Sequence, residues 1–300
     1  MNRIVKSVDY DYVGLRKIID MLCCKNPVLQ QFSIGKSCAG RDIPAIKIHS
    51  DTEYVLFTAA FHGSEHITSN ILLMFLEELT CAYTHNCSLC GINVRKALGK
   101  RGIMFVPIIN PDGCEISIHG ALGCGREAGD IYKMCQGDFT HWNANLRGVD
   151  INHNFDAGWQ ELHDLERKSG IFGPAATRFG GYTPCSEPET QALVRLCSEH
   201  NIHHALALHS QGEVIYWSYN GYETKTSKRM AEIMATTSGY ALDVPVGLAL
   251  GGGFKDWFLK EYLRPAFTVE VGRGKNPLPI ADASKIYNDI CEMLTIYSIM

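Results

Sequence analysis

The sequence predicts an α/β fold, in which a single domain is built on a mixed, mostly parallel central sheet flanked by helices. Predicted strands and helices alternate along the chain, which is typical of such sheets. Continuous apolar runs rich in β-forming residues indicate strands covered on both faces, at 54–61, 102–109 and 265–272. No repeat, linker or low-complexity tract divides the 300 residues, so one domain is the simpler interpretation.

The N-terminal segment is expected to form a helix followed by a hairpin. Residues 9–24 carry apolar side chains at helical spacing, and this pattern ends before Asn26-Pro27. Segments 29–37 and 42–50 then have the composition of two strands, joined by a turn around Ala39-Gly40.

The middle of the chain predicts another helix, another strand and a long irregular region. Beyond Gly63, one apolar helix face is formed by Ile67, Ile71, Leu72, Phe75 and Leu76. The buried strand at 102–109 leads into a Pro-Asp-Gly turn at 111–113. Residues 114–186 are rich in glycine, cysteine and aromatic residues without a regular pattern, which indicates long functional loops.

The C-terminal part returns to regular alternation. A Ser-x-x-Glu capping box, Ser186 to Glu189, is expected to start a helix over 186–200. Further strands are predicted at 203–210 and 213–217. Further helices are predicted at 225–240, 254–262 and 280–298.

The composition excludes several classes of function. The chain has 46% hydrophobic and 20% charged residues, as an ordinary soluble globular protein does. Its 28 Lys and Arg residues against 32 Asp and Glu residues give a net charge of -4, without the basic patch of a nucleic-acid binder. Neither a secretory signal nor a membrane-spanning run is present, so we expect a cytoplasmic protein. The C-x-x-C pair Cys87 and Cys90 has no second pair, which makes it a weak indication of structural zinc.

A short segment after the first buried strand contains two alternative metal-binding motifs. His62, Glu65 and His66 can be interpreted as H-x-x-E or as H-x-x-E-H. The longer motif needs a helix already formed at His62, but that residue directly follows a β run and Gly63 disfavours a helix interior. We therefore expect His66 to lie in the first helical turn or beside the ligands.

Polar residues gather where predicted strands end, which is where active groups of α/β sheets collect. His62 and Glu65 follow the strand at 54–61, and His209 follows the apolar part of the strand at 203–210. Two imidazoles and one carboxylate satisfy a catalytic zinc ion and leave a fourth position for water. Glu270 remains as a carboxylate that need not touch the metal, as a base acting on zinc-bound water requires.

Six segments, in this order, resemble the signature segments of the zinc carboxypeptidase family: "HGSE", "NPDG", "GVDINHNF", "LHSQGE", "GGGFKDWF" and "FTVEVG". The resemblance covers about residues 54–280. It implies an eight-stranded mixed sheet, one zinc ion bound by His62, Glu65 and His209, and Glu270 as the general base. It also implies that 51–300 form the catalytic domain, with the helix and hairpin of 1–50 as part of the same domain.

Two further roles are implied by the resemblance. Asp150, in "GVD", matches the carboxylate that orients the first zinc histidine and fixes its tautomer. Arg147 matches the arginine that stabilises the oxyanion of the tetrahedral intermediate.

The sequence departs from the classical members of the family at three places. Asn152-His153 stands where they have Asn-Arg, and histidine cannot grip a substrate carboxylate through two parallel hydrogen bonds. The tyrosine that caps the substrate does not occur between residues 241 and 261, so it is absent or supplied by another loop. Lys255 lies at the position that lines the side-chain pocket on the leaving-group side, where a lysine suits a carboxylate.

With "SEPET" and "EVGRGKNPLP", these features most resemble the bacterial branch that cleaves γ-D-glutamyl-L-diamino acid bonds in cell-wall peptides. The second carboxylate of diaminopimelate is a suitable partner for Lys255. We expect a zinc peptidase acting on murein-derived peptides, with no nucleic-acid or membrane partner and no predicted oligomeric state. Alternatives are a metallocarboxypeptidase that releases acidic residues from α-linked peptides, a small-molecule deacylase, and a catalytically silent peptide-binding module.

Overall fold

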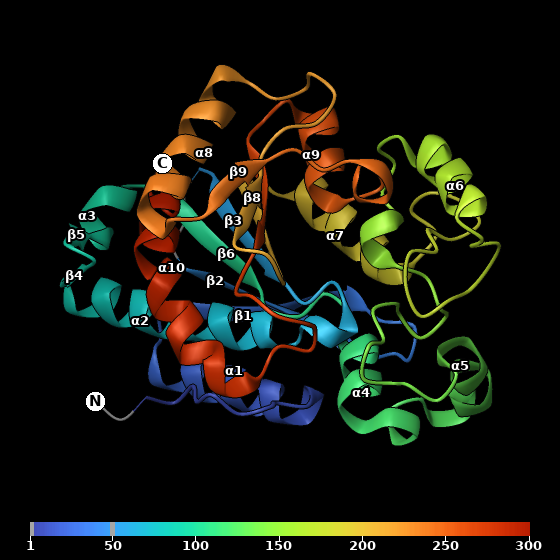
Figure 1. Ribbon diagram of the computed structural model, residues 1–300. Coiled ribbons are helices and arrows are strands. Elements are labelled where there is room, and N and C mark those ends of the chain that lie inside the picture. Colours follow the sequence, from blue (N-terminus) through green and yellow to red (C-terminus); the bar gives the residue numbers. More distant parts are fainter. Residues whose placement is uncertain (1–2, 49–51) are drawn as a thin grey trace.

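Eight strands form the central sheet of the computed structural model, which describes residues 3–48 and 52–300 (Figure 1). They are β1 (Leu29–Lys36), β2 (Asp42–Ile48), β3 (Tyr54–Ala59), β6 (Gly102–Val106), β7 (Ile202–His209), β8 (Val214–Tyr216), β9 (Ala241–Asp243) and β10 (Ala266–Glu270). Their order in the sheet is β1-β2-β6-β3-β7-β10-β8-β9. The central strands β6, β3, β7 and β10 run parallel, while β2, β8 and β9 run in the opposite direction. The predicted fold class is confirmed.

The parallel strands end at one edge of the sheet, and their register aligns the residues that follow. Glu270 at the end of β10 pairs with His209 at the end of β7. Ala59 at the end of β3 pairs with Leu208. Because these three strands are neighbours, residues that are distant in the sequence come together there.

Helices cover both faces of the sheet, and each face has its own apolar core. One core includes α1 (Tyr12–Lys25), α2 (Ile67–His85), α8 (Lys225–Ser238) and α10 (Ala283–Tyr297). The other includes α7 (Pro188–Glu199) and α9 (Phe254–Tyr262). Strand β3 shows the alternation, since Val55 and Phe57 enter the first core and Leu56 enters the second.

The region 114–186 contains helices, so its prediction as long loops is wrong in part. It holds the end of α4 (Pro111–His119), together with α5 (Ala128–Cys135) and α6 (Trp159–Lys168). The Pro-Asp-Gly sequence forms the first turn of α4, because Asn110 accepts a hydrogen bond from Gly113 N at 2.9 Å as the N-cap and Pro111 occupies the first helical position.

The predicted capping box of α7 does not form. Its N-cap is Glu187, because Pro188 takes the first helical position for which its fixed φ is suited. Ser186 Oγ donates to Glu187 Oε1 at 2.8 Å. The Glu189 carboxylate accepts instead from Cys38 N at 2.9 Å. The helix is therefore fixed by tertiary contacts.

Several short elements were not predicted. They are β9, α3 (Val94–Leu98) and the hairpin of β4 (Ser88–Leu89) and β5 (Ile92–Asn93). Cys87 and Cys90 flank β4, and the structure places neither in a group of metal-type donors among the residues it describes.

The boundary predicted between residues 50 and 51 lies outside the described residues, as does the end of the predicted strand 42–50. β2 pairs with β6 in the same sheet, which supports the proposal that residues 1–50 belong to one domain with residues 51–300. Within the described ranges, no helix is both long enough and apolar enough to cross a membrane.

Candidate metal centre and active site

His62 and Glu65 lie on the turn that joins β3 to α2. A 3-10 turn at Gly63–Glu65 bends the chain before α2 begins at Ile67. Gly63 N donates to Asn143 O at 3.2 Å. A Cβ atom at Gly63 would collide with the carbonyl oxygens of Gly113 and Trp142, so this approach requires glycine.

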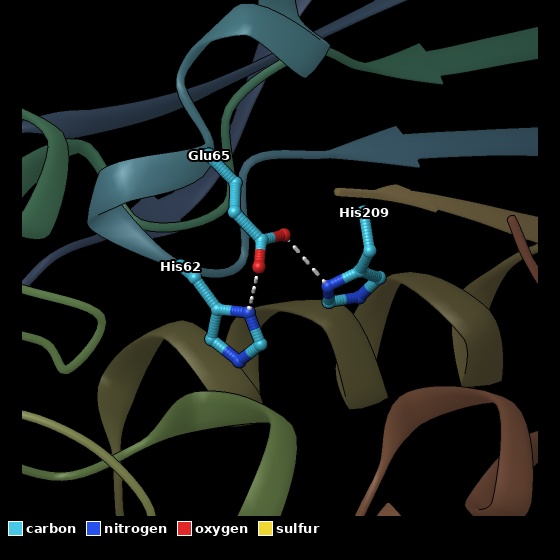
Figure 2. A group of neighbouring side chains, drawn as sticks. All are labelled: His62, Glu65 and His209. Carbon is cyan, nitrogen blue, oxygen red and sulfur yellow. Dashed lines mark hydrogen bonds and ion pairs between the residues drawn. The ribbon is translucent and has the colours of Figure 1, made fainter. Parts of the chain in front are cut away.

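Three side chains converge beyond the strand ends, as Figure 2 shows for His62, Glu65 and His209. His62 Nδ1 lies 2.8 Å from Glu65 Oε1, and His209 Nδ1 lies 3.0 Å from Glu65 Oε2. One ligand atom from each residue lies within 4.8 Å of the others. Glu65 and His209 are buried. The structure thus brings together the three residues that the sequence analysis selected as ligands.

The hydrogen bonds around His62 fit a cation at this point. Asp150 Oδ1 lies 3.1 Å from His62 Nε2, and a carboxylate can only accept, so the imidazole carries its proton on Nε2. The lone pair on Nδ1 then faces the Glu65 carboxylate. Two such acceptors repel each other at 2.8 Å unless a proton or a cation lies between them. Two imidazole nitrogens and a carboxylate are a donor set that suits zinc.

The electrostatics of the buried group favour a positive charge between these side chains, either a proton on His62 or a bound cation. Burial by itself would lower the pKa of His62, but the Glu65 and Asp150 carboxylates raise it well above its usual value. Burial opposes ionisation of Glu65, yet the His62 and His209 imidazoles lower its pKa to about 2. Burial also opposes ionisation of Asp150, but the His62 imidazole holds the pKa of this carboxyl far below its ordinary value. Both carboxylates are therefore ionised at neutral pH.

Glu270 on β10 pairs with His209 on β7. It does not belong to the donor group of His62, Glu65 and His209. Burial and the Glu65 carboxylate raise the pKa of Glu270 well above its usual value, while His62 acts in the opposite direction. Within the described residues, no side chain or backbone group forms a hydrogen bond or ion pair with its carboxylate. The group is available to exchange a proton with a bound molecule.

A cavity of about 250 Å³ lies beside this group. The predicted site residues that line it are His62, Asp150, Asn152, His153, Lys255 and Glu270. Residues that sequence reasoning missed also line it, among them Asn143, Thr177, Arg178, Tyr216 and Thr268. Their positions depend on loop conformation and strand pairing, for which the sequence carries no spacing signal.

His153 is held by a buried carboxylate that the sequence did not reveal. His153 Nδ1 lies 2.8 Å from Glu166 Oε1, so that nitrogen carries a proton. The second Glu166 oxygen accepts from His163 Nδ1 at 3.1 Å and from Gly180 N at 3.2 Å. Glu166 is fully buried on α6. Nε2 is therefore the His153 nitrogen that remains for the cavity.

Asn152 and Lys255 line the cavity next to α9, the helix that contains Lys255. Asn152 Oδ1 accepts from Phe254 N at 3.0 Å, in the first turn of that helix. Lys255 is buried, donates from Nζ to Ser218 O at 2.8 Å and pairs with Asp256. Lys255 lines the cavity with one carboxylate partner already in place, so it is not a solvated surface lysine.

Arg147 is not brought to this cavity. Its side chain is 59% exposed, and Nη1 lies 3.6 Å from Glu187 Oε2. It lines a separate cavity with Met134 and Pro174. Two features accompany this placement: Gly148, at φ 72°, turns the chain between Arg147 and Asp150, and Glu187 pairs with the Arg147 side chain. The oxyanion contact expected of Arg147 is therefore not supported, and Arg178 is the arginine that lines the His62 cavity.

A tyrosine lines the cavity, but it lies on a different element from the one that carries the substrate-capping tyrosine of the classical enzymes. Tyr216 on β8 pairs across the sheet with Thr268, two residues before Glu270 on the same face of β10. Burial and the Glu270 carboxylate raise the pKa of the Tyr216 phenol. Tyr216 and Glu270 thus line the same cavity.

His66 lies outside the donor group. It occupies the N-cap position of α2, where Nε2 lies 3.0 Å from Asp9 Oδ1 and Nδ1 lies 3.4 Å from Gly63 O. The described residues that form the donor group are His62, Glu65 and His209. The arrangement corresponds to the shorter motif, H-x-x-E.

A second cluster of metal-type donors consists of Cys38, Glu187 and Glu189. The Asn145 amide nitrogen lies 2.8 Å from Glu187 Oε2, 3.2 Å from Glu189 Oε2 and 3.3 Å from Cys38 Sγ. The Asn145 amide group therefore already donates to all three ligand atoms. Through these hydrogen bonds, the cluster links the loop before Asp150 to α7. Burial raises the pKa of Glu189 to about 7.

Glu189→Gln is expected to remove a pH-dependent loss of stability. The carboxyl titrates at 4.5 when unfolded and at about 7 when folded, so the folded state holds the extra proton and stability falls as pH rises through this window. The full penalty, about 3 kcal/mol, is present above pH 7. Urea unfolding at pH 5 and pH 8 should show a smaller difference for Glu189→Gln than for wild type. Glu199→Gln, exposed on the same helix, is the control, and an unchanged pH dependence in Glu189→Gln would contradict the assignment.

Comparison with known proteins places the chain among peptidases. A family model described as zinc carboxypeptidase matches residues 16–293. The chain is 34% identical over 284 residues to gamma-D-glutamyl-L-diamino acid endopeptidase 1 of Lysinibacillus sphaericus, covering 94% of this chain and 70% of the relative. Bovine thrombin-activatable fibrinolysis inhibitor, solved with tick carboxypeptidase inhibitor, superposes with a TM-score of 0.74 at 19% identity over 97% of both chains. Murein-tripeptide amidase MpaA of Escherichia coli O157 gives 0.54 at 22% identity, over 88% of this chain and 91% of that one. At these identities the two structures support the fold alone.

Proposed function

The chain belongs to the zinc carboxypeptidase family and is a zinc metallopeptidase; from this premise we propose that it hydrolyses γ-D-glutamyl-diamino acid bonds in murein peptides. The relative from Lysinibacillus sphaericus, which is named for this activity, supports the substrate class. Murein is a bacterial polymer, so the proposal includes a bacterial source. The cytoplasmic location expected from the sequence stays a prediction.

The observation that carries the proposal is the convergence of His62, Glu65 and His209 beside Glu270, whose carboxylate has no partner in the part of the chain that the structure describes. We propose that these three residues hold one zinc ion per chain. When bound, zinc polarises the scissile carbonyl and lowers the pKa of water in the site. Asp150 keeps the His62 ring in the tautomer that leaves Nδ1 free to bind a cation.

Glu270 has the position and environment of the general base. Its carboxylate lines the cavity and has no competing partner among the described residues. We propose that it takes a proton from the attacking water and then passes that proton to the nitrogen of the leaving amine. The proton balance closes without a further acid.

The substrate side of the proposal rests on the cavity wall. Lys255 presents a cation, and Asn152 and His153 line the same space. We propose that Lys255 attracts the side-chain carboxylate of diaminopimelate, although Asp256 already neutralises part of its charge. The same lysine would also favour the alternative of a carboxypeptidase acting on α-linked peptides with acidic C-terminal residues.

A comparison of two peptides tests the proposed function. We expect kcat/KM for L-Ala-γ-D-Glu-diaminopimelate to exceed that for an α-linked peptide ending in Glu by about 100-fold or more. Hydrolysis should stop when a chelator removes the metal and return when zinc is added. Preference for the α-linked peptide would favour the carboxypeptidase alternative. Hydrolysis of neither peptide by zinc-loaded protein would favour a binding module.

A further inference from the structure

One carboxylate, that of Asp150, links Arg178 to His62 of the candidate metal site. Its backbone nitrogen donates to Asp150 Oδ2 at 2.8 Å, and the other oxygen of Asp150 meets His62 Nε2 at 3.1 Å. Arg178 has a φ of 66°, which is uncommon for a residue with a side chain and costs on the order of 1 kcal/mol. The strained backbone is thus anchored to the residue that orients His62, and the side chain lines the cavity.

The guanidinium of Arg178 is a free cation. Among the residues that the structure describes, none forms a hydrogen bond or ion pair with it, and the residue is exposed. The other cationic side chains discussed above are paired: Arg147 with Glu187, and Lys255 with Asp256. Arg178 is therefore the cation of this cavity that is ready to take an anionic group from a bound molecule.

The Arg178 guanidinium differs from a donor that stabilises an oxyanion. Oxyanion stabilisation depends on donors that are fixed in a water-excluded position before the reaction. The Arg178 side chain is exposed, and none of the residues at 3–48 and 52–300 fixes it. A planar guanidinium binds a carboxylate through two parallel hydrogen bonds, which order the side chain on binding. The geometry favours a substrate carboxylate.

A γ-D-glutamyl bond supplies such a carboxylate. Because the side-chain carboxyl forms the scissile amide, the α-carboxyl of the D-glutamyl residue stays free on the acyl side. An ordinary α-linked peptide has no free main-chain carboxylate there. Lys255 comes from α9, whereas Arg178 comes from a loop anchored at Asp150, so the two cations belong to different parts of the cavity wall.

We propose that Arg178 binds the free α-carboxylate of the D-glutamyl residue and so selects γ-linked over α-linked peptides. This inference rests on the proposed function and names the residue that enforces it. Arg178 is a specificity-determining residue, which acts on the acyl part of the substrate.

The test compares two substrates that differ only at this carboxylate. One is L-Ala-γ-D-Glu-diaminopimelate, and the other carries D-isoglutamine, in which the α-carboxyl is a carboxamide. We expect wild type to favour the carboxylate by about 10- to 100-fold in kcat/KM. Arg178→Gln should lose this preference, mainly through a higher KM for the carboxylate substrate, and should change little toward the carboxamide. Arg178→Lys should recover part of the preference, because it keeps the charge without the fork.

The control is Arg229→Gln, an exposed arginine on α8 that does not line the cavity. Zinc content and melting temperature of each variant show whether it is folded. An equal fall in kcat on both substrates would assign Arg178 to the reaction centre and overturn the inference. So would a wild type that cleaves both γ-linked substrates equally, although the proposed function would then stand. Failure of zinc-loaded wild type to cleave either γ-linked substrate would overturn both.

Discussion

Glu270→Gln is expected to lower kcat for the γ-linked peptide by about 10²- to 10⁴-fold while the protein still binds one zinc ion per chain. The amide has the size of the carboxylate but cannot accept a proton from water. Within the described residues Glu270 has no hydrogen-bond partner, so the substitution removes no existing hydrogen bond. Steady-state kinetics together with zinc analysis of the same preparation measure both quantities.

The matched control for this variant is Glu232→Gln, which removes an exposed carboxylate on α8. It is expected to keep wild-type kinetics and zinc content. The assignment of the general base fails if Glu270→Gln, loaded with stoichiometric zinc, hydrolyses the peptide at a rate close to that of wild type. A variant that loses zinc would instead place Glu270 among the metal ligands.

His209→Ala is expected to abolish both zinc binding and hydrolysis. His209 is buried at the end of β7 and supplies one of the three donor atoms. Its loss should weaken zinc binding by more than about 100-fold, which is the upper range for residues that only orient a ligand. Wild type should gain about 4 kcal/mol of stability at a zinc concentration 1,000 times its Kd, and at the same zinc concentration the variant should gain less than about 1.5 kcal/mol. Thermal unfolding with and without zinc measures this difference independently of activity.

His204→Ala separates metal loss from packing loss. His204 is buried on the same strand and bonds to Tyr297 O at 3.0 Å, away from the donor group. This control should lower the melting temperature and yet keep zinc binding and the stabilisation that zinc provides. Zinc-dependent stabilisation as large in His209→Ala as in wild type would remove His209 from the ligand set.

The parts of the site that the sequence predicted are those fixed by strand ends. His62, His209 and Glu270 each follow or end an apolar β run, and parallel strands deliver such residues to one edge of a sheet. Gly63 and the preceding strand were enough to separate His66 from the donor group. These inferences needed only local pattern and one general property of α/β sheets.

The parts that sequence reasoning missed depend on contacts between distant segments. The direction of Arg147 is set by the turn at Gly148 and by Glu187, which lies far along the chain. Arg178 and Glu166 lie in the region that was predicted as loops, and their relation to Asp150 and His153 exists only in the folded chain. Family spacing could not supply these positions, because loops vary in length and path.

The alignment of β3, β7 and β10 also determines at which stage of folding the candidate metal site forms. These strands pair in parallel although long stretches of chain separate them, and pairing of this kind forms late because long loops must close first. The donor atoms of His62, Glu65 and His209 therefore meet only after the central sheet has assembled. We therefore expect zinc to bind after the sheet has formed, and so to stabilise the folded state rather than to accelerate folding.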